Sequence, residues 1–324
     1  MSLLSIVSPA HLGSGDDVQP RNTEALVTAV DRGLPEDVKV DIVGTDTFVR
    51  IRSVGHEVEI RGYNDEPYIE VDPSGAVRVN TSAITYLLNQ TRYGSDVPSI
   101  ETDDVTWEVV STDGEYMWHD HRVHWMSTKP PATMNDDGLI QEWVIPINVD
   151  DQAVTVSGQL YLRDGASRLW WAVGFIAIVL TVLLSLRQRL VFIFMLLGLS
   201  VAGVFVGAAE FFGLPTEARI TPLMLIFSAV AALLGSAAVI AHRIKRDIVV
   251  DPLIAGMGLT FLVLTWQVRE QVTAYYIPGL ETEVLARVLI PCIFGAGIVA
   301  LVDGVRRVVF PDLDREKIAG ASVA

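Results

Sequence analysis

Five long apolar runs dominate the second half of the chain. They cover residues 169–186, 190–211, 220–241, 249–267 and 286–306. A helix needs about 20 residues to cross the hydrocarbon core of a bilayer, and each run is close to this length. We therefore expect five transmembrane helices, and the short connections between them predict antiparallel neighbours in one compact bundle.

The first half has a different pattern, in which apolar and polar residues alternate over short stretches. Such alternation is typical of strands with one buried face. We expect a short helix or loop at 82–93 and strands at 38–43, 47–52, 57–61, 68–71, 77–80, 106–111, 116–125, 141–149 and 153–162. Short strands at this spacing predict an antiparallel β-sandwich. The expected fold class is thus α+β, with an N-terminal sandwich followed by a five-helix transmembrane bundle.

Charge is divided unevenly between the two halves. Residues 1–167 contain 11 Lys and Arg against 28 Asp and Glu, a net charge of −17, whereas residues 168–324 contain 13 against 11, a net charge of +2; the two sum to −15. A surface as acidic as that of the first half repels nucleic acid and anionic lipid headgroups. We therefore exclude nucleic-acid binding and expect cations or basic partners.

Positive residues in the connections predict the orientation in the membrane. Nine follow the first, third and fifth helices, namely Arg187, Arg189, Arg243, Lys245, Arg246, Arg306, Arg307, Arg315 and Lys317. The opposite side has four, namely Arg168, Arg219, Arg269 and Arg287. Because cytoplasmic loops carry the excess of Lys and Arg, we expect a cytoplasmic C-terminus and an N-terminal domain outside the cell membrane.

Translocation of an acidic N-terminal domain requires a signal. Residues 1–10 end in Ser8-Pro9-Ala10, with small residues at the −3 and −1 positions of a cleavage site, and we expect them to end a signal peptide that starts upstream. The predicted organisation is a signal-peptide remnant at 1–10, an extracytoplasmic sandwich at 11–167, the bundle at 168–310 and a cytoplasmic tail at 311–324. Cleavage after Ala10 would place His11 at the mature N-terminus.

Histidines are concentrated in one stretch of the first half. Residues 118–125 read Trp-His-Asp-His-Arg-Val-His-Trp and include His119, His121 and His124. In a strand, His119 and His121 would share one face, while His124 would lie with Asp120 on the other unless a bulge intervenes. Two imidazoles on one face are candidate ligands for Cu(II) or Zn(II), and His11 is a candidate third ligand through its imidazole and terminal amine.

Two interpretations of this stretch remain open. In the first it is a packed sheet whose imidazoles bond to Asp120 or to the backbone. In the second His11, His119 and His121 bind a metal, His124 is a further candidate ligand, and Asp120 orients an imidazole if a bulge brings it round. The candidate N-terminal histidine favours copper, with zinc as second choice.

Parts of the first half resemble known families. The stretch Trp107-Glu-Val-Val-Ser-Thr-Asp-Gly114 is similar to a strand and turn of the CopC-type copper-binding sandwiches, which place one histidine at the mature N-terminus and another after this turn. Here Glu115 follows the turn and the histidines begin four residues later. The His-x-His pair is similar to the soluble domain of the B subunit of membrane-bound copper monooxygenases. Segments 62–68, 85–87, 92–94 and 118–126 resemble a set of uncharacterised actinobacterial multi-pass membrane proteins, which implies no activity.

Three functions are compatible with these patterns. The first is a membrane-anchored extracytoplasmic metal-binding protein, with copper as the expected metal, for storage, delivery or resistance. The second is a non-catalytic envelope scaffold or accessory subunit bound to another membrane or envelope protein, and the third is a copper oxidase-like subunit. The sequence contains no GxSxG, Walker A, GxGxxG or HExxH motif, so we expect neither hydrolase nor nucleotide-dependent chemistry.

Ionisable residues inside the predicted spans are few. Glu210, Asp251 and Asp303 all fall near span ends, where we expect them to reach water. Cys292, the chain's one cysteine, lies in an apolar run and is expected to be a small packing residue.

Overall fold

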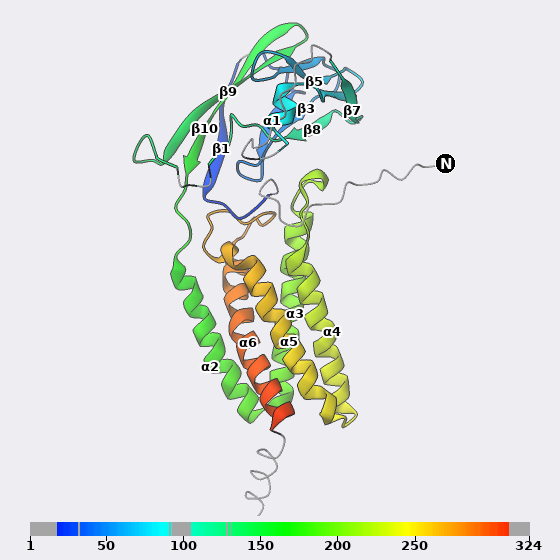
Figure 1. The fold of residues 1–324 in the computed structure, drawn as a ribbon, viewed down its shortest axis with the longest axis vertical. Coiled ribbons are helices and arrows are strands. Elements are labelled where there is room, and N and C mark those ends of the chain that lie inside the picture. The colour runs from blue at the N-terminus through cyan, green and yellow to red at the C-terminus, as the bar shows by residue number, and fades with distance from the viewer. Residues whose placement is uncertain are drawn as a thin grey trace, which may run out of the picture. The chain divides into compact units, whose positions relative to one another are not determined.

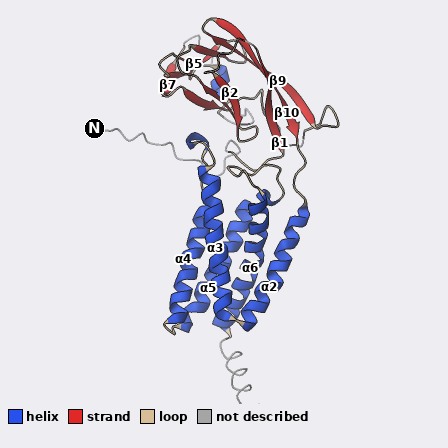
Figure 2. Ribbon diagram, turned by 180° about the vertical axis from the view of Figure 1, so that it is seen from behind, coloured by secondary structure: helices blue, strands red, loops and turns tan. Residues whose placement is uncertain are grey.

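The computed structural model describes residues 18–31, 33–90, 92, 105–127, 129 and 131–310. The chain divides into two compact units (Figure 1). The first comprises residues 1–164 and 215–220, and the second comprises residues 165–214 and 221–324. Strands belong to the first unit and the long helices to the second (Figure 2), so the expected α+β class is confirmed.

Ten strands in the described part of the first unit form two antiparallel sheets. The larger sheet has the order β1-β10-β9-β4-β5-β6-β7 and the smaller has the order β2-β3-β8. The strands are β1 (Thr23–Val30), β2 (Lys39–Val43), β3 (Phe48–Arg52), β4 (Val58–Arg61), β5 (Pro67–Val71), β6 (Val77–Asn80), β7 (Trp107–Ser111), β8 (Glu115–Trp118), β9 (Leu139–Val149) and β10 (Gln152–Leu162). The nine predicted strands all exist, and a short helix α1 (Ile84–Leu88) lies where a helix or loop was expected.

The core of the first unit is made by alternate residues of both sheets. Val49 and Ile51 of β3 contribute from the smaller sheet, and all the following larger-sheet positions are at most 2% exposed: Val58, Ile60, Ile69, Val71, Val77, Val79, Ile145, Ile147, Val149 and Val156. Successive side chains of a strand point to opposite faces. The alternation in the sequence therefore corresponds to the buried face of these strands.

The β9–β10 hairpin owes its tight turn to two aspartates. Asp150 and Asp151 both have positive φ, at 48° and 63°, and Val149 pairs with Gln152 directly across the turn. Two consecutive residues in this region match the right-handed twist of the flanking strands, and Asp tolerates the conformation better than most residues.

Strand β1 was not predicted from the sequence. Its residues, TEALVTAV, do not alternate strictly, and within it only Ala25 is fully buried. A bulge between Val27 and Ala29 interrupts its pairing with β10. Gly158 of β10 permits the close approach, because a Cβ there would lie 2.3 Å from the Leu26 carbonyl oxygen. The formation of β1 thus depends more on its pairing with β10 than on a hydrophobic pattern in its own residues.

Five helices of the second unit are long and apolar enough to cross a membrane. They are α2 (Ala172–Arg187), α3 (Arg189–Phe212), α4 (Leu223–Arg243), α5 (Asp247–Val268) and α6 (Val284–Val309). Each predicted span corresponds to one of them, so a multi-pass membrane protein is indicated. Helices α3 to α6 pack in sequence order, and α2 packs mainly on α6 (Figure 1).

Glycines bring the helix backbones close together. A Cβ on Gly258 of α5 would lie 2.3 Å from the Leu301 nitrogen of α6, and one on Gly295 of α6 would lie 2.4 Å from the Gly174 oxygen of α2. Small residues at helix contacts permit this approach, which provides van der Waals contact in a solvent without a hydrophobic driving force.

One end of the bundle holds a cluster of paired charges. Arg189 at the start of α3 pairs with Asp251 of α5 and, at 3.3 Å, with Asp303 of α6. Asp303 also accepts from Arg307 at 2.9 Å and Arg306 at 3.4 Å. Asp303 is buried rather than exposed to water as expected, and three guanidinium groups compensate its charge.

Candidate functional site

The histidine-rich segment leaves the sheet after Trp118. The predicted strand 116–125 ends there, because residues 119–124 form a loop and turn. Buried Asp120 directs the chain: its carboxylate accepts from the Trp118 indole at 2.9 Å, from the Arg122 main-chain nitrogen at 3.0 Å and from the Arg122 guanidinium at 2.6 and 2.8 Å. Aspartate bonded to backbone two residues on is a turn-forming arrangement, so the alternation argument fails beyond residue 118.

The turn nevertheless brings the three predicted imidazoles together. The ring centroid of His124 lies 5.1 Å from that of His121 and 6.1 Å from that of His119, and both pairs are nearly perpendicular. Phe48 at the start of β3 lies 4.5 Å from His119, and Tyr63 lies 6.1 Å from His121. His11, the fourth predicted ligand, lies outside the described residues.

His124 occupies the centre of this histidine cluster and is fully buried. Its Nε2 lies 2.9 Å from the main-chain oxygen of Arg92. A carbonyl oxygen only accepts, so Nε2 carries the hydrogen and Nδ1 is an unprotonated lone pair. That Nδ1 is buried and has no hydrogen-bond partner among the described residues. Burial, followed by the charge of Arg92, lowers the pKa of His124 to about 3, so the ring is neutral.

Asp120 is engaged with groups other than imidazole. Burial alone would raise the pKa of this carboxyl, yet the adjacent Arg122 guanidinium holds the pKa below its ordinary value. Besides Trp118 and Arg122, Asp120 contacts the Tyr63 hydroxyl at 3.4 Å. Through these contacts, Asp120 fixes the turn that carries the histidines.

Tyr63 holds the turn from the loop between β4 and β5. Its hydroxyl donates to Asn89 Oδ1 at 2.5 Å and accepts from the His121 main-chain nitrogen at 2.7 Å. The Arg122 guanidinium lies 5.1 Å from the centre of its ring, within cation–π range. Burial raises the pKa of Tyr63 well above its ordinary value, so the hydroxyl remains protonated.

A buried ion pair lies beside the cluster. The Arg92 guanidinium donates to Asp46 at 2.7 Å, and the two side chains are 2% and 0% exposed. Asp46 lies in the turn between β2 and β3 and also accepts from Thr23 Oγ1 at 2.7 Å. Sequence reasoning missed Tyr63, Arg92 and Asp46, because single polar residues in turns carry no pattern that predicts burial.

Metal coordination by this cluster depends on donors beyond those described. Within the described residues, no group of three or more His, Cys, Asp or Glu is placed to hold one metal ion. The closest pair of rings, His121 and His124, can supply two imidazole donors. A further donor would have to come from a residue such as His11.

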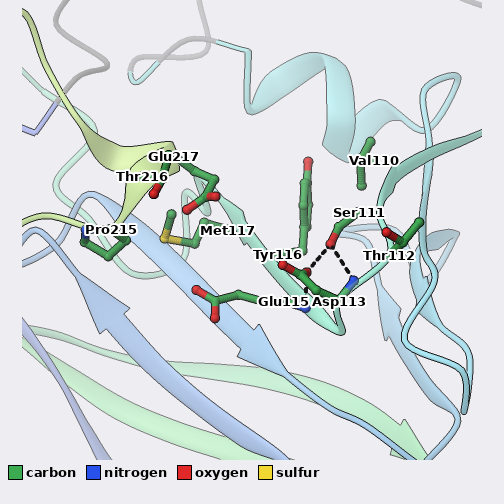
Figure 3. A pocket seen from close by; sticks show the side chains of 10 residues that line it. All are labelled: Val110, Ser111, Thr112, Asp113, Glu115, Tyr116, Met117, Pro215, Thr216 and Glu217. Carbon is green, nitrogen blue, oxygen red and sulfur yellow. Dashed lines mark hydrogen bonds between the residues drawn. The ribbon is translucent and has the colours of Figure 1, made fainter. Parts of the chain in front are cut away.

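A separate pocket of about 610 Å³ lies in the first unit (Figure 3). Its lining includes three acidic residues, of which Asp113 accepts from Ser111 Oγ at 2.5 Å and Glu115 pairs with Arg50 at 3.3 Å. The other lining residues are Val110, Thr112, Tyr116, Met117, Pro215, Thr216 and Glu217. Two of its three acids, Asp113 and Glu115, therefore already have partners.

Comparison of the chain with protein-family models, with curated proteins and with solved structures found no match.

Proposed function

We propose that the protein is a membrane-anchored, extracytoplasmic metal-binding protein whose site is the cluster of His119, His121 and His124. Copper is the proposed metal and zinc the second choice, and the proposed role is storage, delivery or resistance. The helices serve as the anchor, and His11 is the proposed additional ligand.

The observation that carries this proposal is the state of His124. Histidines that bind metals commonly donate their other ring N–H to a carbonyl or carboxylate, which fixes the tautomer and presents the free lone pair to the metal. His124 has this arrangement with the Arg92 carbonyl, and its Nδ1 lone pair has no partner among the described residues. A buried acceptor without a partner costs about 1–3 kcal/mol, and a bound metal ion would remove that cost.

The proposed location is the outer side of a cell membrane, with a cytoplasmic C-terminus. The connections after α2 and α4 and the end of α6 carry the excess of Lys and Arg, which is retained on the cytoplasmic side. Cysteines introduced at exposed Ser74 and at exposed Lys245, in a Cys292→Ser background, test this. A membrane-impermeant thiol reagent added to intact cells should label only the cysteine at position 74. Labelling only at position 245 would show the opposite orientation and refute the proposed location.

Metal binding is tested on the full-length protein in lipid nanodiscs. Metal-free protein is titrated with Cu(II), Cu(I) and Zn(II) against a competing chelator, and bound metal is measured by elemental mass spectrometry. We expect near-stoichiometric copper in the wild type and at least tenfold weaker binding in His121→Gln and His124→Gln. The variants His56→Gln and His242→Gln are matched controls, because these histidines lie outside the cluster. Unchanged binding in both cluster variants, with folding intact by circular dichroism, would refute the site.

The envelope-scaffold alternative rests on β7. This strand lies at one edge of the larger sheet, and Val109 and Val110 on it are 59% and 41% exposed. Exposed apolar residues on an unpaired edge favour addition of a strand from another protein. Two results together would favour this alternative. The wild-type protein would take up no metal, and the Val109→Lys variant would no longer capture a partner protein that the wild type captures from native membranes.

A further inference from the structure

Two residues of the bundle bring polar side chains together near the ends of their spans. Glu210 lies in the last turn of α3, and Gln271 lies in the short helix η3 (Arg269–Val272) that follows α5. The two side chains are hydrogen-bonded to each other, and Gln271 is only 8% exposed. The segment after η3 is pressed onto α3 beside them, because a Cβ on Gly279 would lie 2.0 Å from the Glu210 carbonyl oxygen.

The hydrogen bond leaves an acceptor on each side chain. Gln271 donates only through Nε2, so its amide N–H is the group that bonds to an ionised carboxylate. Glu210 Oε1 and Gln271 Oε1 are both buried and lack a hydrogen-bond partner within the described residues. Two adjacent buried oxygens without donors are unfavourable together, because each loses its hydration and the two repel each other.

Among the described residues, no cation pairs with Glu210. Charged residues of η3 and of the start of α6 are paired elsewhere: Arg269 with Glu270 at 3.4 Å, and Arg287 with Glu283 at 2.6 Å. No ion pair among the described residues includes Glu210. A buried carboxylate oxygen without a partner is costly when the group is ionised.

We propose that Glu210 is a proton-binding site of the helical bundle and forms a cyclic acid–amide pair with Gln271. Gln271 Nε2–H donates to one carboxyl oxygen. The protonated oxygen of Glu210 donates to Gln271 Oε1. One proton, taken from water, therefore supplies the missing donor to both orphaned oxygens and removes the buried charge.

The pair makes a sharp distinction between two substitutions. Glu210→Gln places two amides face to face, and two amides form the same cyclic pair through two N–H donors without an added proton. This variant should fold normally at neutral pH and should not depend on protonation. Gln271→Leu removes the amide but leaves the carboxyl buried, so the proton should remain while its hydrogen bond is lost.

The test is infrared spectroscopy of the full-length protein in nanodiscs at pH 7.5, combined with carbodiimide labelling, which modifies protonated carboxyl groups. We expect a protonated-carboxyl C=O band that disappears in Glu210→Gln and moves to higher frequency in Gln271→Leu. Peptide mapping should find the adduct on Glu210 and not on Glu283, which pairs with Arg287. Absence of this band in the wild type would overturn the proton site. Labelling of Glu210 by the carbodiimide only under acidic conditions would also overturn it. An unchanged band frequency in Gln271→Leu would overturn the acid–amide pair. If Na⁺, but not a larger cation, protects Glu210 from carbodiimide labelling, the site binds sodium and the proton site is overturned.

Discussion

Removing Arg92 should expose how strongly the buried ion pair supports the histidine cluster. The substitution Arg92→Leu deletes the guanidinium that donates to Asp46 at 2.7 Å, and the Asp46 side chain is 0% exposed. The carboxylate would keep the hydroxyl of Thr23 at 2.7 Å, while Arg21 Nε stands 3.7 Å away. Breaking a buried pair on one side costs about 3–5 kcal/mol, and we expect the lower end because these two groups remain.

The measurement is amide hydrogen exchange of the full-length protein in nanodiscs. Asp46 joins β1 to the turn between β2 and β3, so peptides from these strands should lose about 3 kcal/mol of protection in Arg92→Leu. The double variant Asp46→Leu/Arg92→Leu removes both charges and should lose less than the sum of the single variants. A loss below about 1 kcal/mol in Arg92→Leu, the range of exposed pairs, would refute the reasoning, as would full additivity in the double variant.

Three further substitutions test other parts of the fold. Gly158→Ala should loosen β1 by about 1–3 kcal/mol, seen as faster exchange of its amides, because the added Cβ would lie 2.3 Å from the Leu26 oxygen; unchanged exchange would contradict the close approach. Glu66 accepts three hydrogen bonds, and although burial opposes it, those from Thr85 hold its pKa below the ordinary value. Its contribution to stability is therefore fully present above the unfolded-state pKa and is lost as the pH falls through the lowered folded-state pKa. The free energy of unfolding should therefore fall less steeply with decreasing pH in Glu66→Gln than in the wild type, and equal slopes would contradict this role. Gly258→Leu should lower the melting temperature of the bundle by several degrees, since the side chain would meet the Leu301 backbone; Gly198→Leu, with nothing within 4 Å, is the control.

The sequence predicted those elements whose own residues carry a period. The five helices and nine of the ten described strands follow from long apolar runs and from alternation. β1 was missed because its burial depends on the bulge opposite Gly158, a property of the pair. The predicted strand 116–125 is too long, because the hydrogen bonds of Asp120 to Trp118 and Arg122 form a turn after residue 118. The sequence suggests Asp120 as a partner of imidazole and gives no sign of this turn.

The candidate site was predictable in its residues and not in its surroundings. Three histidines within six positions are visible in the sequence, and the structure brings them together through a turn and not through a shared strand face. Tyr63, Arg92 and Asp46 come from distant turns, so their proximity follows only from the pairing of strands. The assignment of His11 and of a metal stays a prediction, because His11 lies outside the described residues.

The partnership of α2 with α6 has a consequence for biosynthesis. α2 emerges from the ribosome first among the five helices, yet its main neighbour is the last to be made. α4, α5 and α6 can each pack on the preceding helix as soon as they enter the membrane. α2 must wait beside lipid or a translocation factor until residues beyond 284 are inserted. A nascent chain stalled before α6 would therefore leave the Gly174 face of α2 exposed to the quality-control machinery. Insertion of α6 into the membrane would then cover this face.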